Sequence, residues 1–187
     1  IISASKYLPQ MEEIFAQYDL PTELTRLPLV ESSFNENAIS KVGASGIWQF
    51  MPHIGRSYMK VTETIDERNS PLKATEAAAK LMLANFRMLK NWPFALTAYN
   101  HGPGGIRKAS KALKTEDLSL IIEKYNSDRF GFASSNFYTS FLAALHGERY
   151  QDEIFGEISK YPPHRSDSIK LTQRLRVGTL ASIAGIT

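Results

Sequence analysis

Residues 70–89 carry the pattern that most restricts the fold of this chain. Ser70 and Pro71 are a typical helix cap and first-turn pair, and apolar residues then recur at helical spacing as far as Leu89. Several of these are alanines, including Ala77 and Ala78, whose small side chains let neighbouring helices approach closely. We therefore expect a long, buried central helix with other helices packed around it.

The other periodic segments are helical as well. Residues 7–18 repeat apolar side chains at spacings of 3, 4 and 7, and a second helix is expected to begin at Pro21 and to kink or end near Pro28. Residues 61–65 are expected to form at most a short β-ribbon. Further helices are expected at 93–100, 105–113, 116–125 (with Thr115 as cap) and 134–149. The pattern predicts an all-α fold.

The pattern changes at Pro162-Pro163. The residues that follow are richer in Ser and Arg, and the last segment, LRVGTLASIAGIT, reads as a short β–α start. We expect one helical domain over residues 1–160, and a linker with a partial C-terminal module over 161–187.

Composition excludes several classes of function. The chain has no cysteine, which rules out disulfides, thiolate metal sites and a cysteine nucleophile. Its four histidines are scattered without a metal-ligand spacing, so we expect neither a metal nor another cofactor. The net charge of +3 suits an anionic polymer, but no basic stripe or motif indicates nucleic acid. No apolar stretch approaches the ~18 residues needed to span a bilayer, and we expect a monomer.

Glu31 is the residue that most needs an explanation. It lies four residues after Leu27, on the stripe expected to face the interior, next to Val30 and Phe34. A carboxylate there loses hydration, so its pKa should rise, and an acid protonated at neutral pH can protonate a glycosidic leaving group. Spacing alone equally allows Glu31, just past Pro28, to face water.

An ordered set of short motifs accompanies this glutamate. It comprises Glu31-Ser32-x-Phe34, AIS at 38–40, GASGIWQFMP at 43–52, AYN at 98–100 and the glycine loop at 102–105. In this order the motifs resemble the catalytic domain of the soluble lytic transglycosylases, most closely the membrane-bound D-type, and goose-type lysozymes share that fold. The resemblance covers residues 20–150. It implies a lysozyme-like helical domain that cuts the glycan strands of peptidoglycan.

The resemblance also implies roles for single residues. Glu31 matches the sole catalytic acid/base, and Tyr99 and Asn100 match the motif that faces it. The other implied substrate-binding positions are Ser40, Gln49, Met51 and Tyr138. Two further explanations stay open: loop hydrogen bonding for Gln49 and Asn100, and core packing for Met51 and Tyr138.

The sequence departs from the family pattern at one of these places. Many members have a glutamate where this chain has Ser134, four residues before Tyr138. The departure leaves the orientation of Tyr138 open and indicates a variant substrate preference.

The number of carboxylates bears on the expected reaction. Glycosidases ordinarily use two carboxyl groups, and no second acidic residue lies in the matched motifs. In the family's reaction the substrate supplies the nucleophile: the muramoyl 6-hydroxyl attacks C1 and leaves a 1,6-anhydro end without consuming water. The resemblance thus implies non-hydrolytic cleavage of the β-1,4 bond between N-acetylmuramic acid and N-acetylglucosamine, with Glu31 as single acid/base.

Two alternatives remain at this point. The first is lysozyme-type hydrolysis, in which Asp66 or Glu67 positions a water, although Asp66 could instead pair with Arg68 and support the fold. The second is a non-catalytic glycan-binding module. Because peptidoglycan lies outside the cytoplasmic membrane, we expect an exported protein, periplasmic or associated with the cell envelope. The segment GTLASIAGIT resembles the opening of a LysM repeat.

Overall fold

The computed structural model describes residues 1–164 and 172–185, and in this part of the chain the structure is helical. Extended backbone is limited there to three isolated antiparallel bridges, Ile39–Ser45, Ser45–Phe50 and Val61–Asp66. The last joins the first residue of the expected ribbon to the residue just after it. Ten α-helices and three short 3-10 helices are η1 (Ala4–Lys6), α1 (Leu8–Gln17), η2 (Thr22–Arg26), α2 (Leu27–Glu31), α3 (Pro52–Gly55), η3 (Glu67–Asn69), α4 (Pro71–Leu89), α5 (Trp92–His101), α6 (Pro103–Leu113), α7 (Leu118–Lys124), α8 (Phe132–Arg149), α9 (Gln151–Phe155) and α10 (Val177–Ala184).

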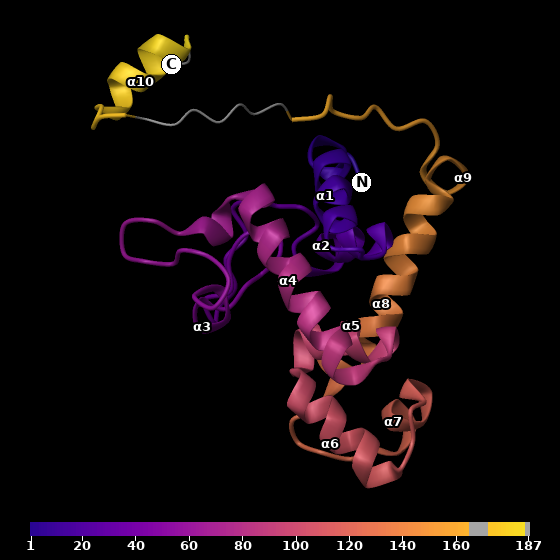
Figure 1. Cartoon of the computed structure of the whole chain (residues 1–187). Helices are drawn as coiled ribbons and strands as arrows, with labels where there is room; N and C mark the ends of the chain where they lie inside the picture. The colour runs from indigo at the N-terminus through magenta and orange to yellow at the C-terminus, as the bar shows by residue number, and fades with distance from the viewer. Residues whose placement is uncertain (165–171, 186–187) are drawn as a thin grey trace.

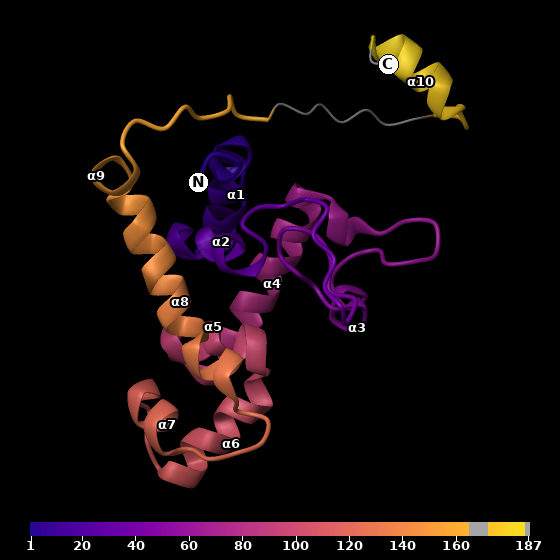
Figure 2. The same ribbon diagram turned by 180° about the vertical axis from the view of Figure 1, so that it is seen from behind.

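The helix expected at residues 71–89 is the central one. In Figures 1 and 2, α4 runs between the long loop that carries α3 and the helix α8, while α6 and α7 lie together at the end away from α1. Ala77 and Ala78 on α4 are almost fully buried, and the helix packs against α1, α5 and α6. The small side chains of α4 therefore let several helices pack closely against it, as the sequence indicates.

Two groups of buried apolar residues hold the helices together. The larger lies between α1, α2, α4 and the loop before α3, and includes Phe15, Leu27 and Trp48. The smaller lies between α5, α6 and α7 and includes Phe94 and Ile106. The inner faces of the helices meet at these two groups, and α5 contributes to both.

Three expectations about helix ends were wrong in detail. No α-helix begins at Pro21: a 3-10 helix comes first and α2 starts at Leu27, because Pro28 lacks an N–H and is tolerated only in a first turn. Helix α7 is capped by Asp117, which accepts from Ser119 N at 2.8 Å, rather than by Thr115. Ser70 occupies the cap position of α4, but its side chain makes no capping hydrogen bond.

The segment after α9 returns to the start of the chain. His164 N donates to Lys6 O at 2.7 Å, and Ser5 Oγ donates to Tyr161 O at 3.0 Å. Residues 161–164, expected to belong to a linker, thus lie against η1. The rest of the expected linker, residues 165–171, and the last two residues lie outside the described part, and the proposed domain boundary remains a prediction. The expected β–α start is seen as the helix α10, with no strand in residues 172–176.

Candidate active site

Glu31 is the last residue of α2 and is half-buried. Burial raises the pKa of its carboxyl group from 4.5 to about 7. The chain turns sharply after it: Ser33 and Phe34 both have positive φ angles, and Phe34 is buried. Ser32 Oγ donates to Ile47 O at 2.8 Å and so ties the end of α2 to the loop before α3. Glu31 is therefore held by the short helix before it and by a turn that the Ser32 hydrogen bond and the buried Phe34 fix in place.

Tyr99 on α5 lies beside Glu31. Its pKa is raised well above the ordinary value, chiefly by burial and further by the charge of Glu31. The hydroxyl donates to Trp48 O at 2.8 Å, and the ring is stacked 6.4 Å from that of Phe137. Tyr99 is thus a neutral hydrogen-bonding group, held between the loop before α3 and helix α8.

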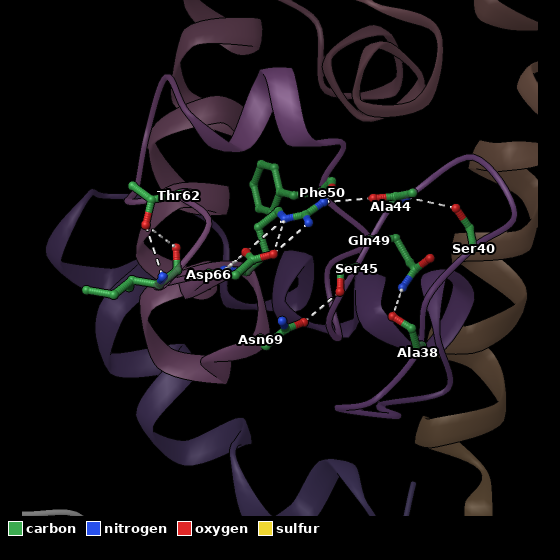
Figure 3. Close-up of polar contacts among 12 residues, drawn as sticks. Ala38, Ser40, Ala44, Ser45, Gln49, Phe50, Thr62, Asp66 and Asn69 are labelled. Atoms are coloured by element: carbon green, nitrogen blue, oxygen red, sulfur yellow. Dashed lines mark hydrogen bonds and ion pairs between the residues drawn. The ribbon is translucent and has the colours of Figure 1, made fainter. Parts of the chain in front are cut away.

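The loop of residues 38–51 is stabilised by its own polar side chains (Figure 3). Gln49, in the left-handed region at φ 48°, donates from Nε2 to Ala38 O at 3.0 Å and to Gly46 O at 2.8 Å. Ser40 Oγ accepts from Ala44 N at 2.9 Å. The amide nitrogen of Gln49 is thereby occupied within the loop, which leaves its Oε1 as the polar atom available to a ligand.

Arg68 anchors this loop from the side of η3. The residue is only 8% exposed, and its Nη1 donates to Gly43 O at 2.8 Å and to Phe50 O at 2.9 Å. At the same time Nη2 pairs with Asp66 Oδ2 at 2.6 Å. Gly46 comes so close to the same segment that a Cβ atom there would lie 1.9 Å from Arg68 O. The shape of the loop therefore depends on one buried cation and one glycine.

The two carboxylates considered as water-positioning groups both have partners in this framework. Arg68 holds the pKa of Asp66 below its ordinary value by hydrogen bonding, and Asp66 also accepts from Arg68 N at 3.1 Å. Glu67 Oε2 accepts from Lys60 N at 2.7 Å, at the base of the 60–67 turn. Each carboxylate is engaged in supporting its own segment.

Asn100 belongs to a chain of hydrogen bonds that links α5 to α8. Ser134 Oγ, on a 6% exposed residue, donates to Asn100 Oδ1 at 2.9 Å and lies 3.1 Å from His101 Nδ1. Because the hydroxyl has one hydrogen, it can only accept from His101, which must carry its proton on Nδ1. The amide group of the exposed Asn100 is then fixed with its NH₂ turned away from Ser134.

The sequence alone does not predict these hydrogen bonds among Asn100, Ser134 and His101. From the sequence, His101 is one of four scattered histidines without a metal-ligand spacing, and Ser134 is a departure from the family pattern. The departure was the usable signal, because a short hydroxyl in place of a long acid leaves room for direct contacts with Asn100 and His101.

The remaining predicted residues lie at the edges of this arrangement. Met51 is half-buried and immediately precedes α3. Tyr138 packs against both buried groups and lines a separate cavity of about 320 Å³ with Leu118 and Leu142. No hydrogen bond from Tyr138 is seen within the described residues. The position of Tyr138 thus fits packing between α5, α7 and α8 as well as a place beside the substrate.

Two further findings concern metal binding and membrane crossing by the described residues. No group of three or more His, Cys, Asp or Glu side chains is placed there to hold a metal ion. None of the helices in residues 1–164 and 172–185 has the length and apolarity that a membrane crossing requires.

Comparison with known proteins gives the chain its relatives. Residues 11–122 match the family described as transglycosylase SLT domain. The chain is 39% identical over 103 residues to membrane-bound lytic murein transglycosylase D from Escherichia coli (strain K12), which covers 54% of this chain and 23% of that relative. The fold of the present chain is similar to that of an inactive glutamate-to-glutamine mutant of lytic transglycosylase Slt from Pseudomonas aeruginosa. The TM-score is 0.60 and the sequence identity 20%, and the match covers 75% of the present chain and 24% of the Slt chain.

Proposed function

Because this chain belongs to the transglycosylase SLT domain family, we propose that it cleaves the β-1,4 bond between N-acetylmuramic acid and N-acetylglucosamine in peptidoglycan. The Escherichia coli relative is named a lytic murein transglycosylase. The chain spans about a quarter of the length of that relative, so the activity of the whole protein is inferred from this domain.

The observation that carries the proposal is the state of Glu31. With a pKa of about 7, a large fraction of this carboxyl group is protonated at neutral pH. Such a group can give its proton to a glycosidic oxygen and then, as a carboxylate, accept one from a nucleophile. The lytic transglycosylase Slt from Pseudomonas aeruginosa has an inactive glutamate-to-glutamine mutant, so a glutamate is essential in that protein.

The reaction balances without water. Glu31 protonates the glycosidic oxygen as its bond to the muramoyl C1 breaks, with assistance from the muramoyl N-acetyl group. The 6-hydroxyl of the same sugar then forms a bond to C1 and gives its proton to Glu31. The acid is regenerated, the muramoyl residue ends as a 1,6-anhydro sugar, and the intramolecular attack benefits from a high effective concentration.

Lysozyme-type hydrolysis is the competing reaction. It needs a second carboxylate to position a water, and Asp66 or Glu67 would have to supply it. Their contacts argue against that role, since Asp66 is paired with Arg68 and Glu67 accepts from Lys60 N. We therefore favour the non-hydrolytic route.

The substrate-facing residues are proposed in the same way. Asn100 would offer its NH₂, Gln49 its Oε1 and Ser40 its hydroxyl hydrogen, while Met51 and Tyr138 would offer apolar surface to sugar rings.

We further propose an exported protein, located where peptidoglycan lies, in the periplasm or at the cell envelope. Non-catalytic glycan binding is the outcome to be excluded.

Purified peptidoglycan and mass spectrometry of the released fragments test the proposal. The wild-type protein should release fragments with anhydro ends, each one water lighter than a reducing end, and Glu31→Gln should release none. Asp66→Asn and Glu67→Gln should still give anhydro ends. Exclusively reducing ends from the wild type would refute the non-hydrolytic route, and undiminished release by Glu31→Gln would refute an enzymatic role for Glu31.

A further inference from the structure

A cavity lies between the first turn of α6 and the segment that joins α7 to α8. Its volume is about 490 Å³. His101 forms one wall, and a Cβ atom on Gly105 would lie only 2.5 Å from the His101 ring, so the approach of this ring requires glycine. The lining also includes Gly104, Lys108, Asp128 and Arg129.

The lining is electropositive. Lys108 and Arg129 are exposed, and neither forms an ion pair within the described residues. Asp128 supplies the one carboxylate among the lining side chains. The pKa of His101 is lowered, first by burial and then by the positive charge of Arg129, so this ring is neutral. Two cations against one carboxylate leave the cavity suited to an anion.

The cavity and the surroundings of Glu31 are linked through the end of α5. Tyr99, Asn100 and His101 are consecutive at the end of α5: the first lies beside Glu31 and the last lines the cavity. Residues two apart on a helix are separated by a rise of only about 3 Å but point to different sides of it, so Tyr99 and His101 do not face each other. The exposed Asn100 lies between them at the end of α5, and Ser134 Oγ contacts both Asn100 and His101. A group attached to a sugar near Glu31 would therefore reach the cavity by passing round the end of α5, over Asn100.

We propose that this cavity binds the carboxylates of the acidic peptide stems that branch from the muramoyl residues of peptidoglycan. The proposal rests on the proposed function, because the stem enters with the glycan strand. A peptide of a few residues spans ~3.3–3.6 Å per residue, which is enough to pass Asn100. The guanidinium of Arg129 suits a bidentate carboxylate contact, and Lys108 adds a second charge-assisted donor.

A binding experiment that needs no catalysis tests the cavity by itself. The probes are a synthetic stem peptide with free carboxylates and the same peptide with every carboxylate converted to an amide, each titrated into the full chain and followed by NMR. The acidic peptide should shift the signals of His101, Gly104, Gly105 and Lys108, and the amidated peptide should not. The variant Lys108→Ala/Arg129→Ala should weaken binding about tenfold, as expected for two partly exposed charge contacts.

The matched control removes two exposed cations of α6 that do not line the cavity, as Arg107→Ala/Lys111→Ala. It should leave the affinity within about twofold of the wild type. The proposal is overturned if the peptide does not bind, if the amidated peptide binds as well, or if the control variant loses as much affinity.

The cleavage assay then separates this proposal from the proposed function. Lys108→Ala/Arg129→Ala should lower kcat/KM about tenfold on stem-bearing strands and leave it unchanged on strands from which the peptides have been removed. Equal losses on both substrates would contradict a stem site. Absence of cleavage of either substrate by the wild type would instead refute the enzyme assignment, and the peptide titration would still decide the cavity.

Discussion

Replacing Glu31 by Gln should increase the stability of the protein at the same time as it abolishes cleavage. The pKa of Glu31 in the folded protein, about 7, lies above the ordinary value of 4.5. Between these values the folded state binds more protons than the unfolded state, so the free energy of unfolding falls as the pH rises. Each pKa unit corresponds to ~1.36 kcal/mol, so the full effect is about 3 kcal/mol. This loss of unfolding free energy is absent below pH 4.5 and complete above pH 7.

Gln has nearly the same shape and does not ionise, so the Glu31→Gln variant escapes this penalty. Its stability relative to the wild type should increase by about 2–3 kcal/mol between pH 4 and pH 8. Urea unfolding of both proteins at pH 4, 6 and 8 measures the difference. The control is Glu13→Gln, which removes an exposed carboxylate of α1 and should change stability by less than about 0.5 kcal/mol at each pH. A difference between Glu31→Gln and wild type that stays constant over this range would refute a buried, weakly acidic Glu31.

Three further outcomes are expected. Activity should fall as the pH rises through about 7, since the first step needs the protonated form of Glu31; a pH profile of kcat/KM measures this, and a rate that rises there would contradict it. Arg68→Met should lower the free energy of unfolding by about 2–4 kcal/mol, because two loop carbonyls and a carboxylate lose their donor; an unchanged urea midpoint would speak against the anchor. Ser134→Ala should raise KM and release the Nδ1–H tautomer of His101, seen in ¹⁵N NMR shifts, whereas the neighbouring Ser135→Ala should do neither.

Much of the fold could be predicted because helices depend on local sequence. The central helix, the helix that ends at the glycine loop and the helix near 134–149 were all expected from apolar spacing, and the structure confirms them as α4, α5 and α8. The ends were less predictable. Pro28 divides its segment into a 3-10 and an α-helix because a proline within the first turn is tolerated, a choice that apolar spacing does not reveal.

The site depends on contacts between distant parts of the chain, and these were harder to predict. The motif pattern gave the candidates, but it could not show that Gln49 turns its amide nitrogen back to Ala38 and Gly46. Nor could it show the bond between Ser134 and Asn100, which are 34 residues apart. Such contacts follow from how helices pack, and no local period in the sequence records them.

The way the loop before α3 is anchored has a consequence for how its sequence can vary. Arg68 and Gln49 bind it through the main-chain carbonyls of Ala38, Gly43, Gly46 and Phe50, which every residue type possesses. Lys41 and Val42 are both exposed, and these hydrogen bonds to main-chain carbonyls do not depend on their side chains. In a saturation mutagenesis library these two positions should accept many residues, while Gly46 and Arg68 accept almost none. The exposed part of this loop can thus change its chemistry while the hydrogen bond from Ser32 to Ile47 still ties the loop to the end of α2, where Glu31 lies.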